Sequence, residues 1–574
     1  MSDRVSMDTD IVCVGFGPAA GGFLITLAPK LAELERPPQI MCCERADGMG
    51  FGVSGVVTRA RGIRQSFPNL DTATIPLAAP VTEEKLVYLL DPIGASHRSL
   101  PLRALDTLLS AARPCNHGIE LPYIPAFLHK KDGLVLSIGQ FNQWVGEQIM
   151  MSGRAQIWPS MPVAGPIIEG ERVTGVRLAE GTDIRARLTV VADGPVGAVG
   201  RALDQTFGAP PGFERNEWAV GCKMVVDLPA DSPLETGIVI HTLGFPEPEI
   251  FGFLYVHPEG VASVGIFVPC FLHSPVRTSY RYLQHFIQHP FLWRWLKGAR
   301  MRSWGAKSLL ESGRRGEPWL AGNGYVRIGE GSGSTNVLTG SGVDEAWTTG
   351  MQLADGVFEL LRENAPFTRE NLERTYVARR RQSWVEHEAR IAENARNGFE
   401  RGFLTGVLGM ALAGLTKGQL LVHRNQKARQ AVSPARYFRG RLSPELLATL
   451  HHDARASAVP LHDAVMNRLG WPEIDYDRAL LVSHQDALLM GGKVQGSPGF
   501  ADHVTFRNPE LCAACEVQLC VEMCSGQAIG PSADGGAPTF DREKCVHCGA
   551  CLWNCAHANV DFRAGGGGLH SVEN

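Results

Sequence analysis

Eight of the 14 cysteines lie between residues 512 and 555 and have the spacing of iron–sulfur ligands. The second four follow the C-x2-C-x2-C-x3-C run of bacterial ferredoxins, without the proline that ends that run. In two-cluster ferredoxins the fourth cysteine of each run binds the other cluster. This rule predicts one [4Fe–4S] cluster on Cys524, Cys545, Cys548 and Cys551, and a second on Cys512, Cys515, Cys520 and Cys555.

Zinc is the alternative ligand, because CxxC pairs also make structural zinc sites. Three cysteines at two-residue gaps are instead typical of one face of a cubane. The gap of four residues between Cys515 and Cys520 is unusual for a ferredoxin run. A single cluster therefore remains the alternative to two.

A second candidate site lies near the N-terminus, where an apolar strand (10–14) runs into a glycine-rich turn and then a helix (23–34). The first glycine permits the tight turn, and the second lets the backbone approach a pyrophosphate at the helix N-terminus. A second strand (39–44) ends in Glu44, which is placed to hold a ribose. The candidate dinucleotide-binding residues of these segments are Gly15, Gly17, Pro18, Ala19, Ala20, Glu44 and Arg45.

Two later strands end in acid–glycine pairs and indicate which dinucleotide binds. The strand at 188–194 ends in Asp193 and Gly194, and the strand at 324–333 contains Gly329 and Glu330. Such pairs occur in flavoproteins of the aromatic-hydroxylase plan, although either could be an ordinary turn. The sequence has no second strand–GxGxxG–helix unit for NAD(P). FAD is therefore the expected cofactor.

The whole chain of 574 residues is too long for one hydrophobic core. Its 55 Lys and Arg against 59 Asp and Glu give a net charge of −4, which argues against a nucleic-acid-binding protein. The first ten residues carry acids and no apolar core, so we expect no targeting peptide. No apolar run reaches the length that spans a bilayer.

Residues 401–444 contain eight Lys and Arg and no Asp or Glu. Inside this stretch, 402–415 are 14 residues without a charge, which suits a segment that dips into one leaflet. The flanking cations favour an anionic membrane surface. A buried glycine-rich core helix is the alternative. A second apolar segment with a basic edge, at 120–131, allows the same two interpretations.

With these features in place, the chain resembles the electron-transfer-flavoprotein–quinone oxidoreductase family from end to end. The resemblance rests on the glycine turn, the 80–84 and 137–148 segments, and Cys545-Val-His-Cys548-Gly-Ala-Cys551. It implies flavin contacts at Gly52, Ser54, Gly55, Asn336 and Val337. It also implies one cluster on Cys524, Cys545, Cys548 and Cys551, and a monotopic membrane protein.

Three features depart from that family. The eight-cysteine tail is similar to the small ferredoxin partners of related nitrogen-fixation flavoproteins. Residues 250–255 read Ile-Phe-Gly-Phe-Leu-Tyr, without the family's Tyr-Gly-Gly turn at the quinone. Ser525 follows Cys524 where the family has proline. The chain is thus expected to be a divergent member.

These observations predict an α/β fold in which a mainly β domain is inserted into a Rossmann-like FAD-binding domain. The FAD-binding domain would take residues 1–100, 136–205 and 311–395, and the quinone or substrate domain 101–135 and 206–310. Residues 396–444 would form the membrane-surface segment. Residues 445–574 would form a linker and a ferredoxin-like α+β domain.

The expected function is electron transfer from a reduced electron-transfer flavoprotein, or a similar ferredoxin-like carrier, through [4Fe–4S] and FAD to a quinone. The expected location is the cytoplasmic face of a bacterial-type inner membrane. No residue is assigned acid–base catalysis. Two alternatives stay open: a ferredoxin-fused, FAD-dependent double-bond reductase of the geranylgeranyl type, and an electron-relay subunit of a larger redox complex.

Overall fold

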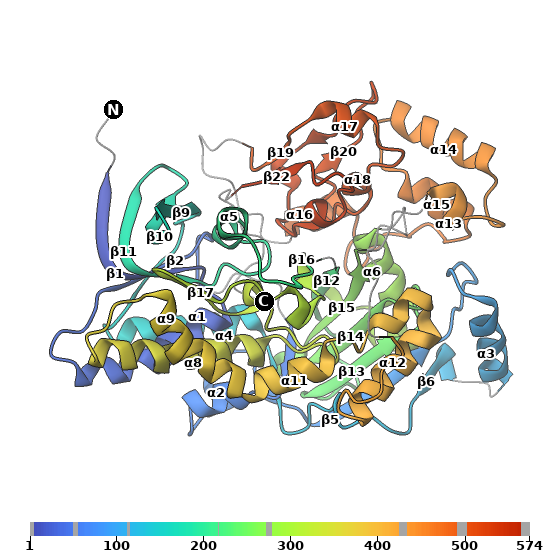
Figure 1. The fold of residues 1–574 in the computed structure, drawn as a ribbon. Helices are drawn as coiled ribbons and strands as arrows, with labels where there is room; N and C mark the ends of the chain where they lie inside the picture. Colours follow the sequence, from blue (N-terminus) through green and yellow to red (C-terminus); the bar gives the residue numbers. More distant parts are fainter. Residues whose placement is uncertain are drawn as a thin grey trace.

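The computed structural model describes residues 5–49, 55–111, 115–215, 217–270, 278–423, 433–490 and 502–563 (Figure 1). Two large sheets form the body, and a small cysteine-rich module at the C-terminal end packs on them (Figure 1). The predicted site residues Gly52 and Ser54 lie outside the described residues.

The first large sheet has eight strands around a parallel core in the order β8–β2–β1–β11–β18. Its central strand β1 ends in the buried run Ile-Val-Cys-Val, which is typical of a parallel strand covered on both faces. The strands are β1 (Ser6–Val14), β2 (Ile40–Cys43), β8 (Gln156–Trp158), β9 (Val163–Glu169), β10 (Arg172–Leu178), β11 (Asp183–Val191), β17 (Ala321–Gly322) and β18 (Tyr325–Arg327).

Helices α1 (Pro18–Lys30) and α8 (Val343–Arg362) cover one face of this sheet and cross at very short range. A Cβ at Gly22 would lie 2.4 Å from the carbonyl oxygen of Trp347, and one at Gly350 would lie 2.0 Å from that of Ala19. Glycine at both positions is therefore needed for this crossing. Helix α4 (Ile138–Met151) joins this layer, and α5 (Ala198–Phe207) packs on the opposite face.

The second large sheet has seven strands in the order β16–β12–β15–β14–β13–β5–β6. It is antiparallel except between β5 and β13. Helices α6 (Ser279–Ile287) and α7 (Pro290–Leu296) cover one face. The strands are β5 (Glu83–Leu89), β6 (Gly118–Glu120), β12 (Trp218–Asp227), β13 (Ile238–Leu243), β14 (Phe251–Val256), β15 (Val261–Pro269) and β16 (Arg300–Leu310).

A three-stranded sheet lies between the two large ones, formed by β3 (Val56–Thr58), β7 (Leu134–Leu136) and β4 (Ala79–Pro80). The remaining helices of the body are α2 (Arg61–Ser66), α3 (Leu100–Ala111), α9 (Arg369–Leu372), α10 (Ala378–Gln382), α11 (Trp384–Ala392) and α12 (Phe403–Leu415). Among the described residues, no helix is long and apolar enough to cross a membrane.

The C-terminal part begins with α13 (Pro434–Tyr437), α14 (Pro444–Ala456), α15 (His462–Arg468) and α16 (His484–Met490). The cysteine-rich module (502–563) follows, with two strand pairs and three short helices. Its strands are β19 (Val504–Phe506), β20 (Ile529–Gly530), β21 (Thr539–Phe540) and β22 (Val560–Phe562), and its helices are α17 (Pro509–Ala513), α18 (Leu519–Glu522) and α19 (Ala550–Trp553). The predicted α/β fold with an inserted β domain and a ferredoxin-like end is confirmed.

Candidate functional site

The turn after β1 has the two properties expected of a dinucleotide site. Gly15 has φ of +88°, and a Cβ there would lie 2.8 Å from the carbonyl oxygen of Ala192, so a larger residue would not fit. A Cβ at Gly17 would meet nothing within 4 Å. Open space therefore lies in front of the N-terminus of α1, where Pro18 takes the first helical position. The turn fits a pyrophosphate.

Glu44 extends from the end of β2 over this turn. Its carboxylate accepts hydrogen bonds from the backbone N–H of Phe16 (2.7 Å) and of Ala46 (3.0 Å). These two bonds hold the carboxylate at the side of the glycine turn, where a ribose would lie. Gly329 also borders α1, because a Cβ at this glycine would lie 2.8 Å from Cβ of Ala19. Ala20 is fully buried in α1.

The two later acids contact protein amides. The Asp193 carboxylate accepts a hydrogen bond from the N–H of Gly200 in α5 (3.0 Å), and burial raises its pKa. Glu330 accepts one from the N–H of Leu310 (2.9 Å), and burial likewise raises its pKa. Both acids therefore fix the turns that carry them. The turns meet, since a Cβ at Gly331 would lie 2.7 Å from the oxygen of Gly194.

The remaining predicted flavin contacts lie on two loops. The Asn336 side-chain oxygen accepts from the N–H of Leu338 and of Thr339, 3.2 Å each, which forms a tight turn. Val337 is buried beside Ala413 of α12. Gly55 has φ of +82°, and its carbonyl oxygen accepts a hydrogen bond from Nζ of Lys223 (2.8 Å).

Lys223 belongs to a row of side chains that no sequence motif marks. Lys223 of β12 pairs with Gly265, Gly265 with Phe253, and Phe253 with His241, so the four lie side by side across the sheet. Lys307 of β16 pairs with Gly221, two residues from Lys223. We call the side that carries Lys223, His241 and Lys307 the basic face. No local sequence pattern marks it, since strand register creates the row.

Burial lowers the pKa of each basic group on this face. The pKa falls to about 7 for Lys223 and to about 3 for His241, and it is also lowered for Lys307. The Nε2 atom of His241 is buried and has no hydrogen-bond partner among the described residues. Each of the three residues nevertheless keeps part of its surface open. The basic face is therefore only partly covered by the rest of the protein, and Lys223 joins it to the Gly55 loop.

The eight clustered cysteines separate into two groups of four in space. Cys512, Cys515, Cys520 and Cys555, the outer tetrad, line one cavity of about 280 Å³. The Asn559 side chain donates to Sγ of Cys512 (3.1 Å), and its backbone N–H donates to Sγ of Cys555 (3.2 Å). Cys555, the last cysteine of the second run, therefore lies beside three cysteines of the first run, as the ferredoxin rule predicts.

The inner tetrad consists of Cys524, Cys545, Cys548 and Cys551. Burial, followed by the charges of Cys524 and Cys548 among other contributions, raises the pKa of the Cys545 thiol. A tetrahedral zinc with bonds of about 2.3 Å would hold its sulfurs about 4 Å apart. Among the described residues, no three cysteine sulfurs lie within 4.8 Å of one another. The described cysteines are therefore spaced more widely than a tetrahedral zinc site requires.

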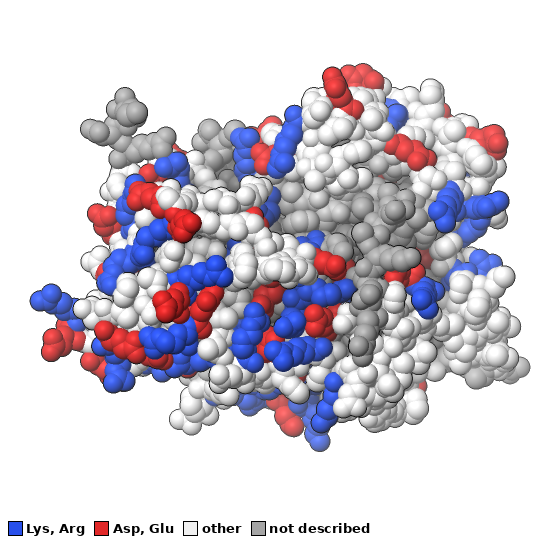
Figure 2. Space-filling view, viewed as in Figure 1, with Lys and Arg blue, Asp and Glu red and all other residues white. Residues whose placement is uncertain are grey.

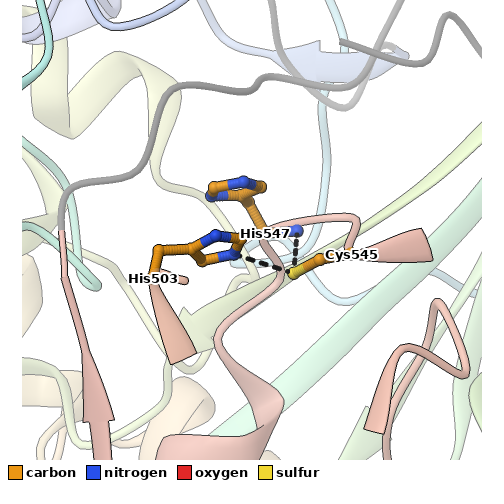
Figure 3. Close-up of side chains that lie close together, drawn as sticks. All are labelled: His503, Cys545 and His547. Atoms are coloured by element: carbon orange, nitrogen blue, oxygen red, sulfur yellow. Dashed lines mark hydrogen bonds between the residues drawn. The ribbon is translucent and has the colours of Figure 1, made fainter. Parts of the chain in front are cut away.

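Two histidines surround Cys545 (Figure 3). Nε2 of the buried His503 lies 3.2 Å from the Cys545 sulfur, and the backbone N–H of His547 donates to the same sulfur over 3.4 Å. The two rings stack with centroids 4.1 Å apart. Nη1 of Arg45 lies 3.5 Å from Nδ1 of His547, and this cation opposes a separate metal ion on the three residues. The two histidines thus contact the sulfur of one cysteine of the inner tetrad.

The inner tetrad rests directly on the second large sheet. The carbonyl oxygen of Cys548 accepts the backbone N–H of Ser308 in β16 over 2.8 Å. Trp553 lies in the sequence between Cys551 of the inner tetrad and Cys555 of the outer tetrad. Its ring stacks on that of Trp218 in β12, with 3.6 Å between the ring centroids. Ser308 faces the module, and its neighbour Lys307 faces the other side, because side chains alternate along a strand. One strand separates the inner tetrad from the basic face.

Comparison with known proteins agrees with this arrangement. The family description "ETF-QO, ubiquinone-binding" matches residues 218–309, which run from β12 to β16. An electron transfer flavoprotein–ubiquinone oxidoreductase of Pseudomonas aeruginosa is 24% identical over 62% of this chain and 65% of its own length. The mitochondrial protein of that name from Rattus norvegicus is 25% identical over 69% of this chain and 64% of its own length. The chain is therefore similar in sequence to electron-transfer-flavoprotein–ubiquinone oxidoreductases.

The match spans slightly less than two thirds of these relatives' length. The residues that match this description contain the basic face and the strands under the inner tetrad. A similar fold is found in a geranylgeranyl bacteriochlorophyll reductase-like protein of Thermoplasma acidophilum, with a TM-score of 0.50 and 16% identity over 78% of this chain and 99% of that one.

Proposed function

We propose that the chain is a membrane-associated oxidoreductase that takes electrons from a reduced electron-transfer flavoprotein, or a similar carrier, by way of iron–sulfur clusters and FAD to a quinone. The observation that carries the proposal is the contact of the inner tetrad with β16, which places the tetrad one strand away from the basic face. The similarity to electron transfer flavoprotein–ubiquinone oxidoreductases supports the same donor and acceptor classes.

The two kinds of site would hold complementary cofactors. The glycine turn, Glu44 and the Gly329 turn would hold FAD, and each cysteine tetrad would hold one [4Fe–4S] cluster. When bound, FAD exchanges two electrons and a cubane one, so the chain would join a one-electron donor to a two-electron acceptor. The Gly55 loop and Lys223 would orient the reacting end of FAD against the basic face.

The positions of the tetrads suggest an order of electron uptake. The outer tetrad lines a cavity whose rim includes the exposed Leu511, Ala514 and Glu516. The inner tetrad is enclosed between the module and the body, with Trp553 against Trp218. A protein donor would therefore reach the outer tetrad first, and the inner tetrad would face the flavin side.

Helix α12 is the proposed membrane contact. Its 13 residues carry no charge, and Leu404, Leu408 and Leu415 are exposed. The basic residues Arg401 and Lys417 lie at its two ends and are also exposed. Apolar side chains flanked by cations suit an anionic leaflet, from which a quinone could reach the sheet. We place this contact on the cytoplasmic face of a bacterial inner membrane.

Anaerobic turnover tests the proposal. Protein with FAD and clusters verified by absorbance and iron content is mixed with reduced electron-transfer flavoprotein and a short-chain ubiquinone. Donor-dependent quinol formation is expected. A fully loaded protein that forms no quinol but reduces a prenyl double bond would favour the double-bond reductase. A fully loaded protein that turns over neither substrate would favour a relay subunit.

A further inference from the structure

Helix α3 projects from the body with leucines on its outer side. Leu100, Leu105 and Leu108 are 79%, 36% and 73% exposed, whereas Leu102 is buried. Leucines at positions 105 and 108 share one helix face because they lie three residues apart. Exposed leucines on an otherwise well-anchored helix indicate a contact surface rather than poor packing.

The inner side of α3 is firmly attached. Asp106 accepts hydrogen bonds from the Tyr88 hydroxyl (2.6 Å) and from Arg98 (2.5 Å), and Leu102 packs on Tyr88 and Leu90. Arg98 also donates to the Tyr88 hydroxyl (3.0 Å). The outward leucines are therefore held in a fixed position.

The same edge of the sheet carries α12. The Phe403 ring at the start of α12 lies 6.3 Å from the Tyr88 ring, and Phe403 packs in the cluster that contains Leu102 of α3. Between the helices, Leu121 and Tyr123 follow β6 and are also exposed. Figure 2 shows a mostly uncharged surface at the lower right, where Figure 1 places α3, β6 and α12. The exposed apolar residues of α3 and of the segment after β6 therefore lie on a mostly uncharged surface that extends to the proposed membrane contact (Figure 2).

Basic residues border the other end of α3. Arg441 donates to the carbonyl oxygen of Ala95 (2.7 Å), and the Tyr437 ring lies 4.6 Å from the His97 ring, so the α13 segment packs on the residues before α3. Arg436 and Arg439 of this segment are exposed. Leucines bordered by cations match an anionic lipid surface, in which headgroups attract the arginines and acyl chains take up the leucines.

We infer that α3 is a second lipid-inserting element, which binds an anionic leaflet together with α12. This inference rests on the proposed membrane contact of α12 and extends it to a helix outside the basic segment. Two separated elements would hold the protein in one orientation, with the sheet edge at β6 against the leaflet. A single short helix would leave it free to tilt.

Vesicle flotation of the full chain tests the inference, with phosphatidylcholine vesicles that contain or lack phosphatidylglycerol. We expect Leu105→Asp/Leu108→Asp to bind at least tenfold more weakly than the native protein, as Leu404→Asp/Leu408→Asp does. Met151→Asp/Leu489→Asp adds two acids at exposed apolar positions on α4 and α16 and is expected to bind normally. Melting temperature and flavin content verify that each variant folds.

The outcomes separate the two proposals. Native binding by the α3 variant, with loss in the α12 variant, overturns the inference and leaves the α12 contact standing. Absence of binding by the native protein overturns both. If light scattering shows a native dimer that the α3 variant converts to a monomer, α3 is an interface between copies instead. Hydrogen exchange gives an independent readout, because amides 100–111 should exchange more slowly when anionic vesicles are present than when they are absent.

Discussion

The backbone N–H of Ser308 donates a hydrogen bond to the carbonyl oxygen of Cys548 over 2.8 Å, which ties a cysteine of the inner tetrad to strand β16. Lys307, the preceding residue, points to the opposite side of that strand, the side that carries Lys223, whose Nζ donates to the carbonyl oxygen of Gly55. The cysteine-rich module and the candidate flavin site therefore share one strand. This contact joins the module to the part of the protein that contains the candidate flavin site.

Gly549 tests this contact. It has φ of +76°, and a Cβ there would lie 2.4 Å from Cγ1 of Val196. Gly549→Ala should push the module off the body and slow flavin reduction after electron uptake at least tenfold, measured by anaerobic stopped flow. Gly535 also has φ of +76°, but a Cβ there would meet only Arg455 at 3.9 Å. Gly535→Ala should therefore retain the native rate within twofold; equal slowing in both variants would mean that backbone strain alone is responsible.

His503 should raise the reduction potential of the inner cluster, because donors to ligand sulfur stabilise the reduced, more negative cluster. His503→Phe keeps a ring that can stack on His547 but removes the donor to Cys545. We expect the inner potential to fall on the order of 60 mV, a tenfold change for one electron. Potentiometry followed by electron paramagnetic resonance measures it.

Two comparisons make the His503 prediction specific. His503→Gln can restore an N–H donor and should recover part of the potential. Asn559→Ala removes a donor from the outer tetrad and should lower the outer potential instead. A potential that is equally low in the Phe and Gln variants would show that ring packing, not the hydrogen bond, matters.

The two glycines of the β1 turn should fail in different ways. Gly17→Leu should remove most bound FAD while the protein still folds, since the space at Gly17 is open and φ there is negative. Gly15→Ala should lower the stability itself by about 1–3 kcal/mol, because it combines a positive φ with a contact to Ala192. Flavin fluorescence after release and thermal unfolding distinguish the two. Full FAD occupancy in Gly17→Leu would place the cofactor elsewhere.

Glu345 gives a prediction for pH. Burial and then the charge of Asp344 raise its pKa to about 7, and the Ser341 hydroxyl donates to its carboxylate over 2.7 Å. The folded pKa lies above the ordinary value of 4.5, so stability is present below pH 4.5 and is lost as pH rises to 7. Glu345→Gln avoids this loss and should be about 3 kcal/mol more stable relative to the native protein at pH 8 than at pH 4.5.

Thermal midpoints of both proteins at pH 4.5, 6 and 8 test the Glu345 prediction. The thermal midpoint of Glu345→Gln relative to that of the native protein should increase up to pH 7 and then stay constant. A gap of one size at every pH would show that Glu345 does not change its charge in this range.

Features with local sequence spacing could be predicted. The glycine turn, Glu44 and the cysteine runs are short motifs whose chemistry depends on neighbours in sequence. The ferredoxin rule groups Cys555 with Cys512, Cys515 and Cys520, and these four residues line one cavity; the clusters themselves remain a prediction. The basic face could not be predicted in this way. Lys223, His241 and Lys307 are brought together by strand register, which depends on pairings among distant segments.

Local motifs also left the roles of two acids open. Asp193 and Glu330 follow strands as in flavoproteins, but in the fold they bind amides of α5 and β16. The flavin contacts predicted at Gly194, Gly329, Asn336 and Val337 remain predictions, since the residues occupy turns that other side chains could also require. Long-range packing decides which strand-end acids face a ligand.

The assignment of the eight cysteines to two clusters is the central claim, and iron analysis with electron paramagnetic resonance of anaerobically purified protein tests it most directly. We predict eight irons in each native chain and signals from two interacting [4Fe–4S] clusters after reduction. Cys555→Ser and Cys512→Ser should lose the same cluster, and Cys524→Ser should lose the other, although Cys555 is nearer in sequence to Cys551. Four irons and one signal, lost in Cys524→Ser and intact in Cys555→Ser, would contradict the account.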